Sequence, residues 1–351
     1  MSDDIPQEQQ LTTVEKVRLG CVPEHFSSPL HQALAKDLFG RHGFELEIVN
    51  CPGGTGEMVT KLKENELDIA IALTEGLISS LCKEDGPFRI IGTYVSSPLT
   101  WSIASSPTGR FGKVSRESPG PEAWEGLKGA KVGVSRLGSG SHLIPFVLAD
   151  QMGWLKDGAS APFEFVPLKD IAGLVNGVKS GAIDTFLWER IMTKPHYDSG
   201  ELHHLSNITP PWPAFMFAAS KKALAHSAAL IGILNVITES AKIFIAGKGT
   251  GDSVRYVSEK YHLPEDDVRV WFSSVAYPAN CREVDRHVLT DCIKVLAKAG
   301  VVGNEALGIP LDRLVDEHVA VVTEEPLEQK IKRHDQQYEK ECRELQAGKS
   351  E

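Results

Sequence analysis

Three predicted helices begin directly after short runs of serine, threonine and glycine, the residue types that suit a polar ligand at a helix start. The runs are Ser27-Ser28, Gly53-Gly54-Thr55 and Ser139-Gly140-Ser141-His142. The first N–H groups of a helix have no partner within it and carry the positive end of the helix dipole, so they favour an anionic or strongly polar group. Serine and threonine are also ordinary N-caps, which would explain any one of these turns alone. Three such turns at equivalent ends of a repeated unit favour binding.

The ends of predicted strands supply a second set of candidates. Glu75 follows one strand, and Trp188-Glu189 close its counterpart in the second half. An aromatic face can stack on a planar ligand, and a carboxylate can bind an amine or a ring nitrogen. The alternatives are core packing for Trp188 and a surface or lobe-to-lobe role for both glutamates. His142 also has two interpretations, ligand contact or a solvent-facing helix start.

The sequence contains no complete motif for catalysis, nucleotide binding or metal binding. The turn at 53–56 lacks the third glycine of a dinucleotide fingerprint and the Gly-Lys-Ser/Thr ending of a phosphate-binding loop. His203-His204 would point to opposite faces of a strand, with no third ligand at suitable spacing. No nucleophile with an adjacent base is evident. We therefore expect no metal, no cofactor and no catalytic residue, and we favour binding over catalysis.

A weak duplication organises the chain. In the first half, strands at 17–22, 44–49 and 69–73 alternate with helices, and in the second half strands at 130–135, 163–167 and 185–188 do the same. Strands alternating with helices of roughly ten to fifteen residues predict right-handed βαβ units and mostly parallel sheets. Asp68 and Asp184 occupy equivalent places in the repeat, and we expect each to cap the turn into its strand.

The predicted fold class is α/β with two lobes, each a mostly parallel sheet flanked by helices, and a helical C-terminal region. Lobe 1 is expected from 14–105 and 209–325, lobe 2 from 106–208, and a C-terminal helix and tail from 326–351. Turn formers near 105–109 and 209–213 mark the expected crossings, where Trp101 and Trp212 are expected to pack in the core or hinge. Ligands of parallel sheets bind beyond the carboxyl ends of the strands, so the three turns should meet in a cleft between the lobes.

Size, charge and cysteine usage limit the class of protein. The chain has 351 residues, 42% of them hydrophobic, which is enough for two cores. A net charge of −10 without clustered lysine and arginine argues against nucleic acid and an anionic membrane as partners. The acidic, glutamine-rich segment 1–10 is not a secretory signal, so we expect a cytoplasmic location. The six cysteines are well separated, and we expect free thiols.

The order of these motifs resembles a known family. The glycine turn at 53–56, Leu67-Asp68, the serine turn at 138–141, Ile183-Asp184 and Trp188-Glu189 resemble the solute-binding proteins for sulfonates, nitrate and thiamine precursors. With the Ser-His-Leu-Ile-Pro run at 141–145, they look more closely like a fungal cytoplasmic family with the periplasmic-binding-protein (type II) fold, founded on Ca-3427 of Candida albicans. The resemblance covers roughly residues 15–320 and implies two lobes closing on a ligand.

The resemblance also has departures. The family has Trp-Glu-Pro where this chain has Trp188-Glu189-Arg190, and the cysteine-rich segment and lysine–histidine pair of the pyridoxal-phosphate-dependent pyrimidine synthases are absent. The favoured function is binding of a small polar or anionic, possibly heterocyclic and thiamine-pyrimidine-like solute, with hinge closure near 104–108 and 208–213. The alternatives are a thiamine-pyrimidine-precursor-type enzyme that uses the same cleft and a non-catalytic regulatory scaffold. A protein partner and the oligomeric state are left open.

Overall fold

Two five-stranded sheets form the framework of the computed structural model, which describes residues 15–84, 86–112, 124–155 and 162–324. The first sheet has the order β2-β1-β3-β10-β4. In it, β10 runs antiparallel to both neighbours while the other four strands share one direction. The strands are β1 Glu15–Cys21, β2 Phe44–Asn50, β3 Ile69–Leu73, β4 Phe88–Val95 and β10 Phe215–Ser220.

The second sheet repeats this plan with the order β7-β6-β8-β5-β9. Here β5 takes the place of β10 and is again antiparallel to both neighbours. The strands are β5 Trp101–Ser105, β6 Lys131–Val134, β7 Glu164–Pro167, β8 Thr185–Glu189 and β9 His203–Ile208. Two lobes with mostly parallel sheets are therefore confirmed, and the duplication expected from the sequence matches the strand order.

The repeated aspartates hold equivalent strands together. Asp68 accepts a hydrogen bond from the backbone N–H of Arg18 at 2.9 Å, and Asp184 accepts one from Lys131 at the same distance. In return, the backbone N–H of each aspartate donates to the carbonyl of the same partner, at 3.0 and 2.9 Å. Each aspartate therefore binds the backbone of the neighbouring strand at the point where β3 or β8 begins, which agrees with the structural role expected for it.

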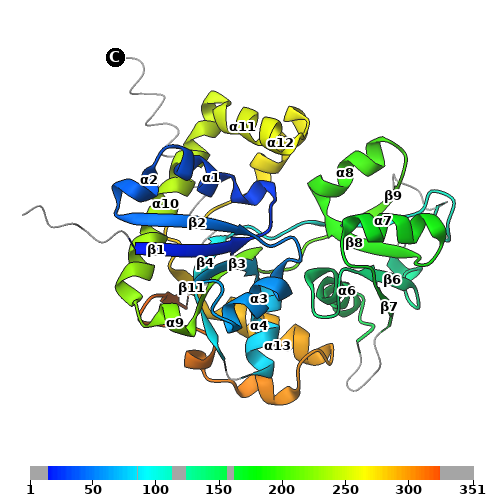
Figure 1. Ribbon diagram of the computed structural model, residues 1–351. Helices are drawn as coiled ribbons and strands as arrows, with labels where there is room; N and C mark the ends of the chain where they lie inside the picture. The colour runs from blue at the N-terminus through cyan, green and yellow to red at the C-terminus, as the bar shows by residue number, and fades with distance from the viewer. Residues whose placement is uncertain (1–14, 85, 113–123, 156–161, 325–351) are drawn as a thin grey trace, which may run out of the picture.

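Helices cover both sheets (Figure 1). In the first lobe they are α1 Ser28–Ala35, α2 Leu38–Arg41, α3 Thr55–Lys63 and α4 Thr74–Lys83. In the second lobe they are α6 Gly140–Gln151, α7 Ile171–Ser180 and α8 Arg190–Asp198. The helices that follow β1, β2 and β3 thus have counterparts after β6, β7 and β8, which extends the duplication from the sheets to the helices.

The C-terminal third packs around the first lobe, as Figure 1 shows. Its helices are α9 Lys221–Leu224, α10 Ser227–Thr250, α11 Asp252–Tyr261, α12 Glu265–Ser274 and α13 Arg286–Lys298. The long α10 is apolar enough to span a membrane by length and composition alone. It packs on α1 and half of its most apolar window is buried, so a core helix of the first lobe explains its composition equally well. The helical C-terminal region expected from the sequence is confirmed, with one addition: β11 Glu283–Asp285 pairs with β12 Val321–Thr323. Short turns of 3-10 helix, η2 Asn304–Gly308 and η3 Leu311–Arg313, separate them, and the helix expected from 326 lies outside the described residues.

The first crossing between lobes lies earlier than predicted. We placed it near residue 105, yet β5 belongs wholly to the second sheet, where Trp101 pairs with Glu189 and with Ile208. The turn formers at 105–109 do form a turn, but at the far end of β5. The chain therefore crosses at 96–100, and the segment 104–108, where a hinge was expected, does not lie at a crossing. The return crossing lies between Ile208 and Phe215, within the predicted segment.

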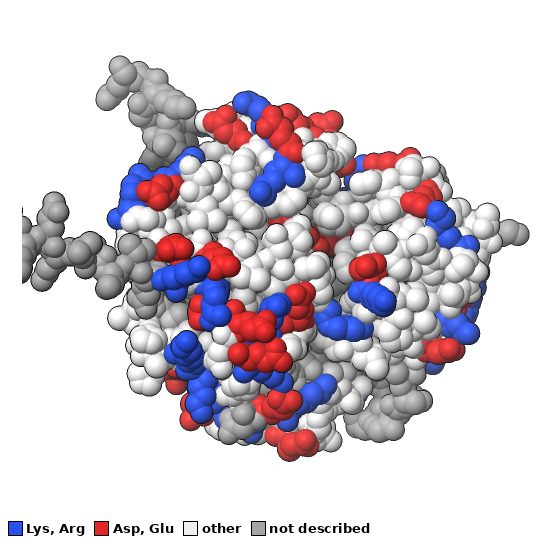
Figure 2. Space-filling model, in the orientation of Figure 1, with Lys and Arg blue, Asp and Glu red and all other residues white. Residues whose placement is uncertain are grey.

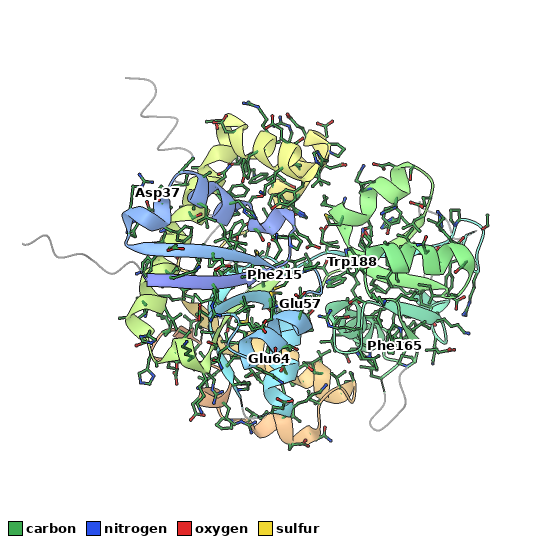
Figure 3. All side chains as sticks on the ribbon, viewed as in Figure 1. Asp37, Glu57, Glu64, Phe165, Trp188 and Phe215 are labelled. Atoms are coloured by element: carbon green, nitrogen blue, oxygen red, sulfur yellow. The ribbon has the colours of Figure 1, made fainter. Side chains whose placement is uncertain are left out.

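The register of the two crossing strands brings strand ends to one place. Phe215, the first residue of β10, pairs with Leu73 and with Val95, the last residues of β3 and β4. Trp101, the first residue of β5, pairs in the same way with Glu189 at the end of β8. Figure 3 shows Phe215 and Trp188 near the junction of the lobes. The carboxyl ends of the parallel strands in both lobes therefore face the gap between them.

Loss of the Asp68 carboxylate should destabilise the first lobe. Asp68→Ala leaves the Arg18 N–H without its acceptor and removes an ion pair of 2.8 Å, so we expect a loss of about 1–3 kcal/mol in the free energy of unfolding. Glu66→Ala, which removes an exposed ion pair with Lys61, is the control and should change it by less than about 1 kcal/mol. Urea unfolding followed by circular dichroism measures both. Equal stabilities for the two variants would contradict the structural role of Asp68.

Candidate functional site

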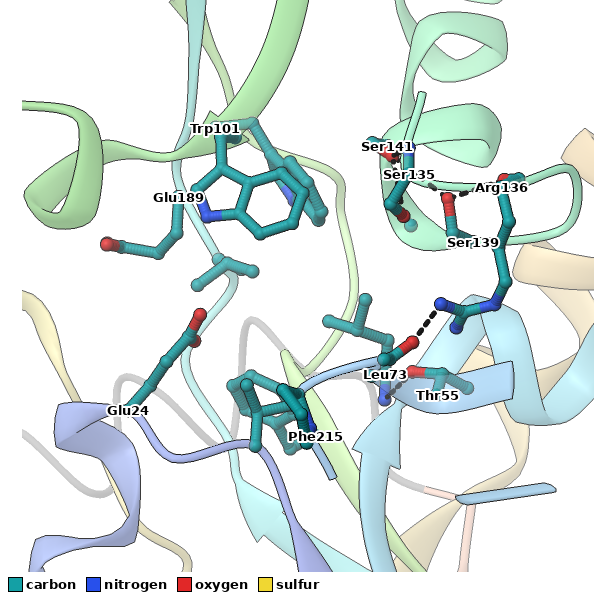
Figure 4. A pocket seen from close by; sticks show the side chains of 17 residues that line it. Glu24, Thr55, Leu73, Trp101, Ser135, Arg136, Ser139, Ser141, Glu189 and Phe215 are labelled. Atoms are coloured by element: carbon teal, nitrogen blue, oxygen red, sulfur yellow. Dashed lines mark hydrogen bonds between the residues drawn. The ribbon is translucent and has the colours of Figure 1, made fainter. Parts of the chain in front are cut away.

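A cavity of about 560 Å³, measured to its open mouth, lies between the lobes. Strand ends and the turns after them line it from both lobes, and Leu99 of the first crossing lies at its wall (Figure 4). The first lobe contributes Val22, Glu24, 52–55, Leu73 and Phe215, and the second contributes Trp101, Ser135, Arg136, 139–141, Trp188 and Glu189.

One end of the cavity is a cluster of hydroxyl groups at the start of α6. Ser141 accepts from the backbone N–H of Ser135 at 2.9 Å, and its oxygen lies 2.9 Å from that of Ser139. Ser139 in turn donates to the carbonyl of Arg136 at 2.8 Å. Both side chains are buried, at 4% and 2% exposure. These bonds hold the two hydroxyls in place at the start of α6, a helix of twelve residues, where the helix dipole favours an electronegative group.

The glycine turn of the first lobe faces this cluster. Gly54 has a φ of +67°, which only glycine adopts readily, and Thr55 accepts a hydrogen bond from the Leu73 N–H at 3.0 Å. The Arg136 guanidinium reaches across from the second lobe and donates to the carbonyl of Gly53. A methyl group at position 56 would lie 2.5 Å from Arg136 Nε, so the guanidinium would have to shift if alanine replaced Gly56. Burial lowers the Arg136 pKa from its usual value, and the nearby Glu57 opposes this shift.

The other end of the cavity is acidic (Figure 4). Glu189 closes β8 and caps α8, where its carboxylate accepts from the Met192 N–H at 2.8 Å. Burial raises the pKa of Glu189 to about 8, and the charge of Glu24 adds to the rise. Burial likewise raises the pKa of Glu24, in the turn after β1, to about 7. Each lobe therefore places one carboxyl group at the same end.

Aromatic side chains form the wall between these ends. Trp101 is 5% exposed, and its indole N–H has no hydrogen-bond partner among the residues that the structure describes. Its ring packs against Gly140, where a methyl group would lie 2.7 Å from Cη2. Trp188 is partly buried, and Phe215 lies across the cavity from Trp101. The wall thus presents aromatic surface and one unpaired donor.

Six of the ten predicted binding residues line this cavity, and four lie elsewhere. The six are Gly54, Thr55, Ser139, Ser141, Trp188 and Glu189. Ser27 and Ser28 are buried and donate to the carbonyls of Val22 and His25, at 3.1 and 2.7 Å. A short 3-10 turn, η1 His25–Ser27, precedes α1 and turns these hydroxyls onto their own backbone. The first of the three turns therefore lines the cavity with Val22 and Glu24 in place of its serines.

Glu75 and His142 also lie off the cavity lining. Glu75 is 2% exposed, and its carboxylate accepts from the indole N–H of Trp212 at 3.0 Å, while burial raises its pKa to about 7. Trp212 itself is buried in the core. His142 Nδ1 accepts from the Gly138 N–H at 3.1 Å, and its ring packs edge-on against Phe165, with burial lowering its pKa to about 4. Both side chains support the fold beside the site.

Sequence reasoning missed Glu24, Trp101 and Arg136. The available signal for Arg136 was a single arginine between the end of β6 and the serine turn, and for Glu24 an acidic residue in the turn after β1. Trp101 was assigned to a crossing because the lobe boundary was placed too late. Among the described residues, no three histidine, cysteine, aspartate or glutamate side chains lie close enough to share a metal ion.

Comparison with known proteins shows which proteins this chain resembles. Residues 114–208 match the family model described as Ca3427-like PBP. The solved structure of the Candida albicans CA3427 gene product, described as exhibiting the generic periplasmic binding protein fold, superposes with a TM-score of 0.76 at 25% identity. That match covers 89% of this chain and 99% of the other. No curated protein matches the chain closely enough to count as a relative.

The acidic end makes stability depend on pH. Glu24 and Glu189 ionise near their ordinary pKa of 4.5 when unfolded but only near 7 and 8 when folded, so stability should fall as pH rises through that window. Glu24→Gln/Glu189→Gln removes this loss, and we expect its melting temperature at pH 8 to exceed that of the wild type by at least roughly 2–4 °C, the shift that about 1 kcal/mol produces. Scanning fluorimetry at pH 5 and pH 8 tests this, with the exposed Glu64→Gln as control. Parallel pH profiles for variant and wild type would refute it.

Two further solved structures share the fold at lower identity. The alkanesulfonate-binding protein SsuA from Xanthomonas axonopodis pv. citri has a TM-score of 0.65 at 13% identity, covering 88% of this chain and 98% of the other. The nitrate-binding protein NrtA from Synechocystis PCC 6803 has a TM-score of 0.65 at 16% identity, covering 87% of each. The expected resemblance is thus confirmed: the chain is a two-lobed protein of the periplasmic-binding-protein fold whose residues 114–208 match the Ca3427-like family.

Proposed function

We propose that this protein binds a small polar or anionic solute in the cavity between its lobes, which close around it. One observation carries the proposal: the buried hydroxyls of Ser139 and Ser141, the start of α6 and Arg136 converge on one cavity that both lobes line. A helix start with hydroxyl donors and a guanidinium suits an oxyanion or a comparable acceptor. Similar proteins named for binding alkanesulfonate and nitrate have the same fold, which agrees with solute binding.

The aromatic wall favours a planar group in the ligand. Trp101, Trp188 and Phe215 offer ring surface between the two polar ends of the cavity. A heterocycle of the thiamine-pyrimidine type would fit such a wall by stacking, with its substituents directed to the polar ends. We keep this ring class as the finer form of the proposal. The cytoplasmic location expected from the sequence also stays a proposal, under which the protein would buffer, carry or sense its ligand.

A retained ligand is the direct test of the proposed function. Native mass spectrometry of protein purified from its host should show a bound small molecule that is lost on unfolding. Adding that molecule back to the stripped protein should raise the melting temperature, since ligand at one hundred times its dissociation constant contributes about 2.7 kcal/mol. Protein that carries no molecule and responds to none from a metabolite extract would refute solute binding and favour the scaffold alternative.

Substitutions at the serine end should weaken binding of the molecule identified in that way. Ser139→Ala or Ser141→Ala removes a hydroxyl worth about 1 kcal/mol, so we expect a three- to tenfold higher dissociation constant. Arg136→Gln should cost tenfold or more, because it removes a charged donor. Isothermal titration calorimetry measures these changes, with Ser27→Ala as the matched serine outside the cavity. Unchanged affinity in Ser139→Ala, Ser141→Ala and Arg136→Gln together would exclude this end as the binding site.

Contacts between the lobes should set the balance between closed and open forms. Lys194 of α8 pairs with Asp267 of α12 at 3.2 Å, and Lys298 of α13 pairs with Asp150 of α6. Each of these partly exposed ion pairs contributes at most about 1 kcal/mol, so the loss of both in Asp150→Asn/Asp267→Asn should favour opening by up to about thirtyfold. We expect a larger radius of gyration in small-angle scattering at low salt than for the control Asp291→Asn, whose ion pair lies within α13. An unchanged radius would show that these pairs do not hold the lobes together.

A further inference from the structure

The acidic end of the cavity has no ion-paired counter-charge within the described part of the chain; Arg190, next to Glu189 in sequence, is exposed, and its charge lowers the pKa of Glu189 less than burial raises it. Both Glu24 and Glu189 line the cavity, and neither forms an ion pair with a described lysine, arginine or histidine. The guanidinium of Arg136 lies at the opposite end, against the glycine turn. The two acids therefore face space that a ligand would fill.

The two carboxyl groups come from different lobes. Glu24 follows β1 of the first sheet, and Glu189 ends β8 of the second. Closure of the lobes brings the like-charged groups toward each other, which is unfavourable in a partly buried site unless protons or a cation lie between them. A ligand with positive charge at this end would turn that repulsion into attraction and would favour the closed form.

A second observation points to a ligand at the same place. The indole N–H of Trp101 is buried without a hydrogen-bond partner among the described residues, and Trp101 is 5% exposed. In Figure 4 the nitrogen edge of this ring is turned toward the space between Glu24 and Glu189. A buried donor without an acceptor costs about 1–3 kcal/mol, and an acceptor atom on the ligand would remove that cost.

Glu189 is held in place for this role. It is 6% exposed, and one of its oxygens accepts from the Met192 N–H at 2.8 Å. Trp101 is its direct partner across the β5–β8 pair. The carboxyl group and the indole are thus positioned by sheet register and by a helix cap, so they need little reorganisation on binding.

We propose that Glu24, Glu189 and Trp101 form a subsite for a protonated nitrogen group, an ammonium or an amidinium, that stands next to an acceptor atom. This inference rests on the proposed function and sharpens it. The ligand class is then a compact molecule with a cationic nitrogen at the acidic end and a polar or anionic group at the serine end. Simple sulfonates or nitrate would satisfy only the serine end and leave the two carboxyl groups unneutralised.

Matched pairs of probes with and without the amine test the inference. The aminated set is 2-aminoethanesulfonate, 3-aminopropanesulfonate and 5-aminopentanoate, and the matched set is ethanesulfonate, propanesulfonate and pentanoate. Calorimetry at pH 8 should show at least tenfold tighter binding of the best aminated probe than of its partner. In Glu24→Gln/Glu189→Gln this preference should fall below threefold, while Glu64→Gln, an exposed control on the surface of the first lobe, should keep it. Circular dichroism confirms that each variant is folded.

The outcomes separate this inference from the proposed function. Equal or tighter binding of the probes that lack an amine would overturn the cation subsite and leave solute binding intact. An amine preference that survives in the double variant would also overturn it. If no probe binds, the molecule retained in native mass spectrometry decides: a basic nitrogen supports the subsite, and a molecule without one refutes it. No retained molecule and no probe binding would refute solute binding and the subsite together.

Discussion

The antiparallel strand inserted into each sheet is the constraint on which the site depends. The chain leaves the first sheet after β4 and enters the second as β5, and it returns as β10. Because each inserted strand starts at the junction, its first residue lies beside the last residues of the neighbouring parallel strands. Phe215 with Leu73, and Trp101 with Glu189, therefore line one cavity although they are far apart in sequence. Strand direction alone, repeated in both lobes, is enough to make the two sets of strand ends face each other.

The two ends of the cavity differ in the contacts that the lobes make there. At the serine end, the Arg136 side chain of one lobe donates to the Gly53 carbonyl of the other, which is favourable without any ligand. At the acidic end, Glu24 of one lobe and Glu189 of the other line the same space, and burial raises the pKa of each carboxyl group. Figure 2 shows acidic and basic side chains interspersed over one face of the molecule, with no large area of one sign on that face. The ligand proposed here would relieve the unfavourable end.

The sequence predicted two lobes of matching plan because glycine turns, aspartates and apolar runs recur in the same order in both halves of the chain. Thr55, Ser139 and Ser141 were found for the same reason, since they stand at helix starts. Ser27 and Ser28 were misjudged because a 3-10 turn of three residues rotates them inward, a shift that composition does not encode. Glu24, Trp101 and Arg136 depend on side-chain direction across the lobe junction, and Trp101 also on where the chain crosses. Such contacts form between segments distant in sequence, so periodicity carries no signal for them.

Ligand choice in such a protein can change while the fold stays constant. The serine end is built largely from backbone and from hydroxyls at a helix start, features that follow from the βαβ plan itself. The acidic end is built from two side chains on separate lobes, of which Glu189 also caps α8. Replacing Glu24, or exchanging Glu189 for another residue that can cap α8, would alter the charge that the cavity accepts without disturbing a strand or a helix. Proteins that share this fold at 13–16% identity can therefore differ at the acidic end of the cavity, and fold similarity alone does not identify the ligand.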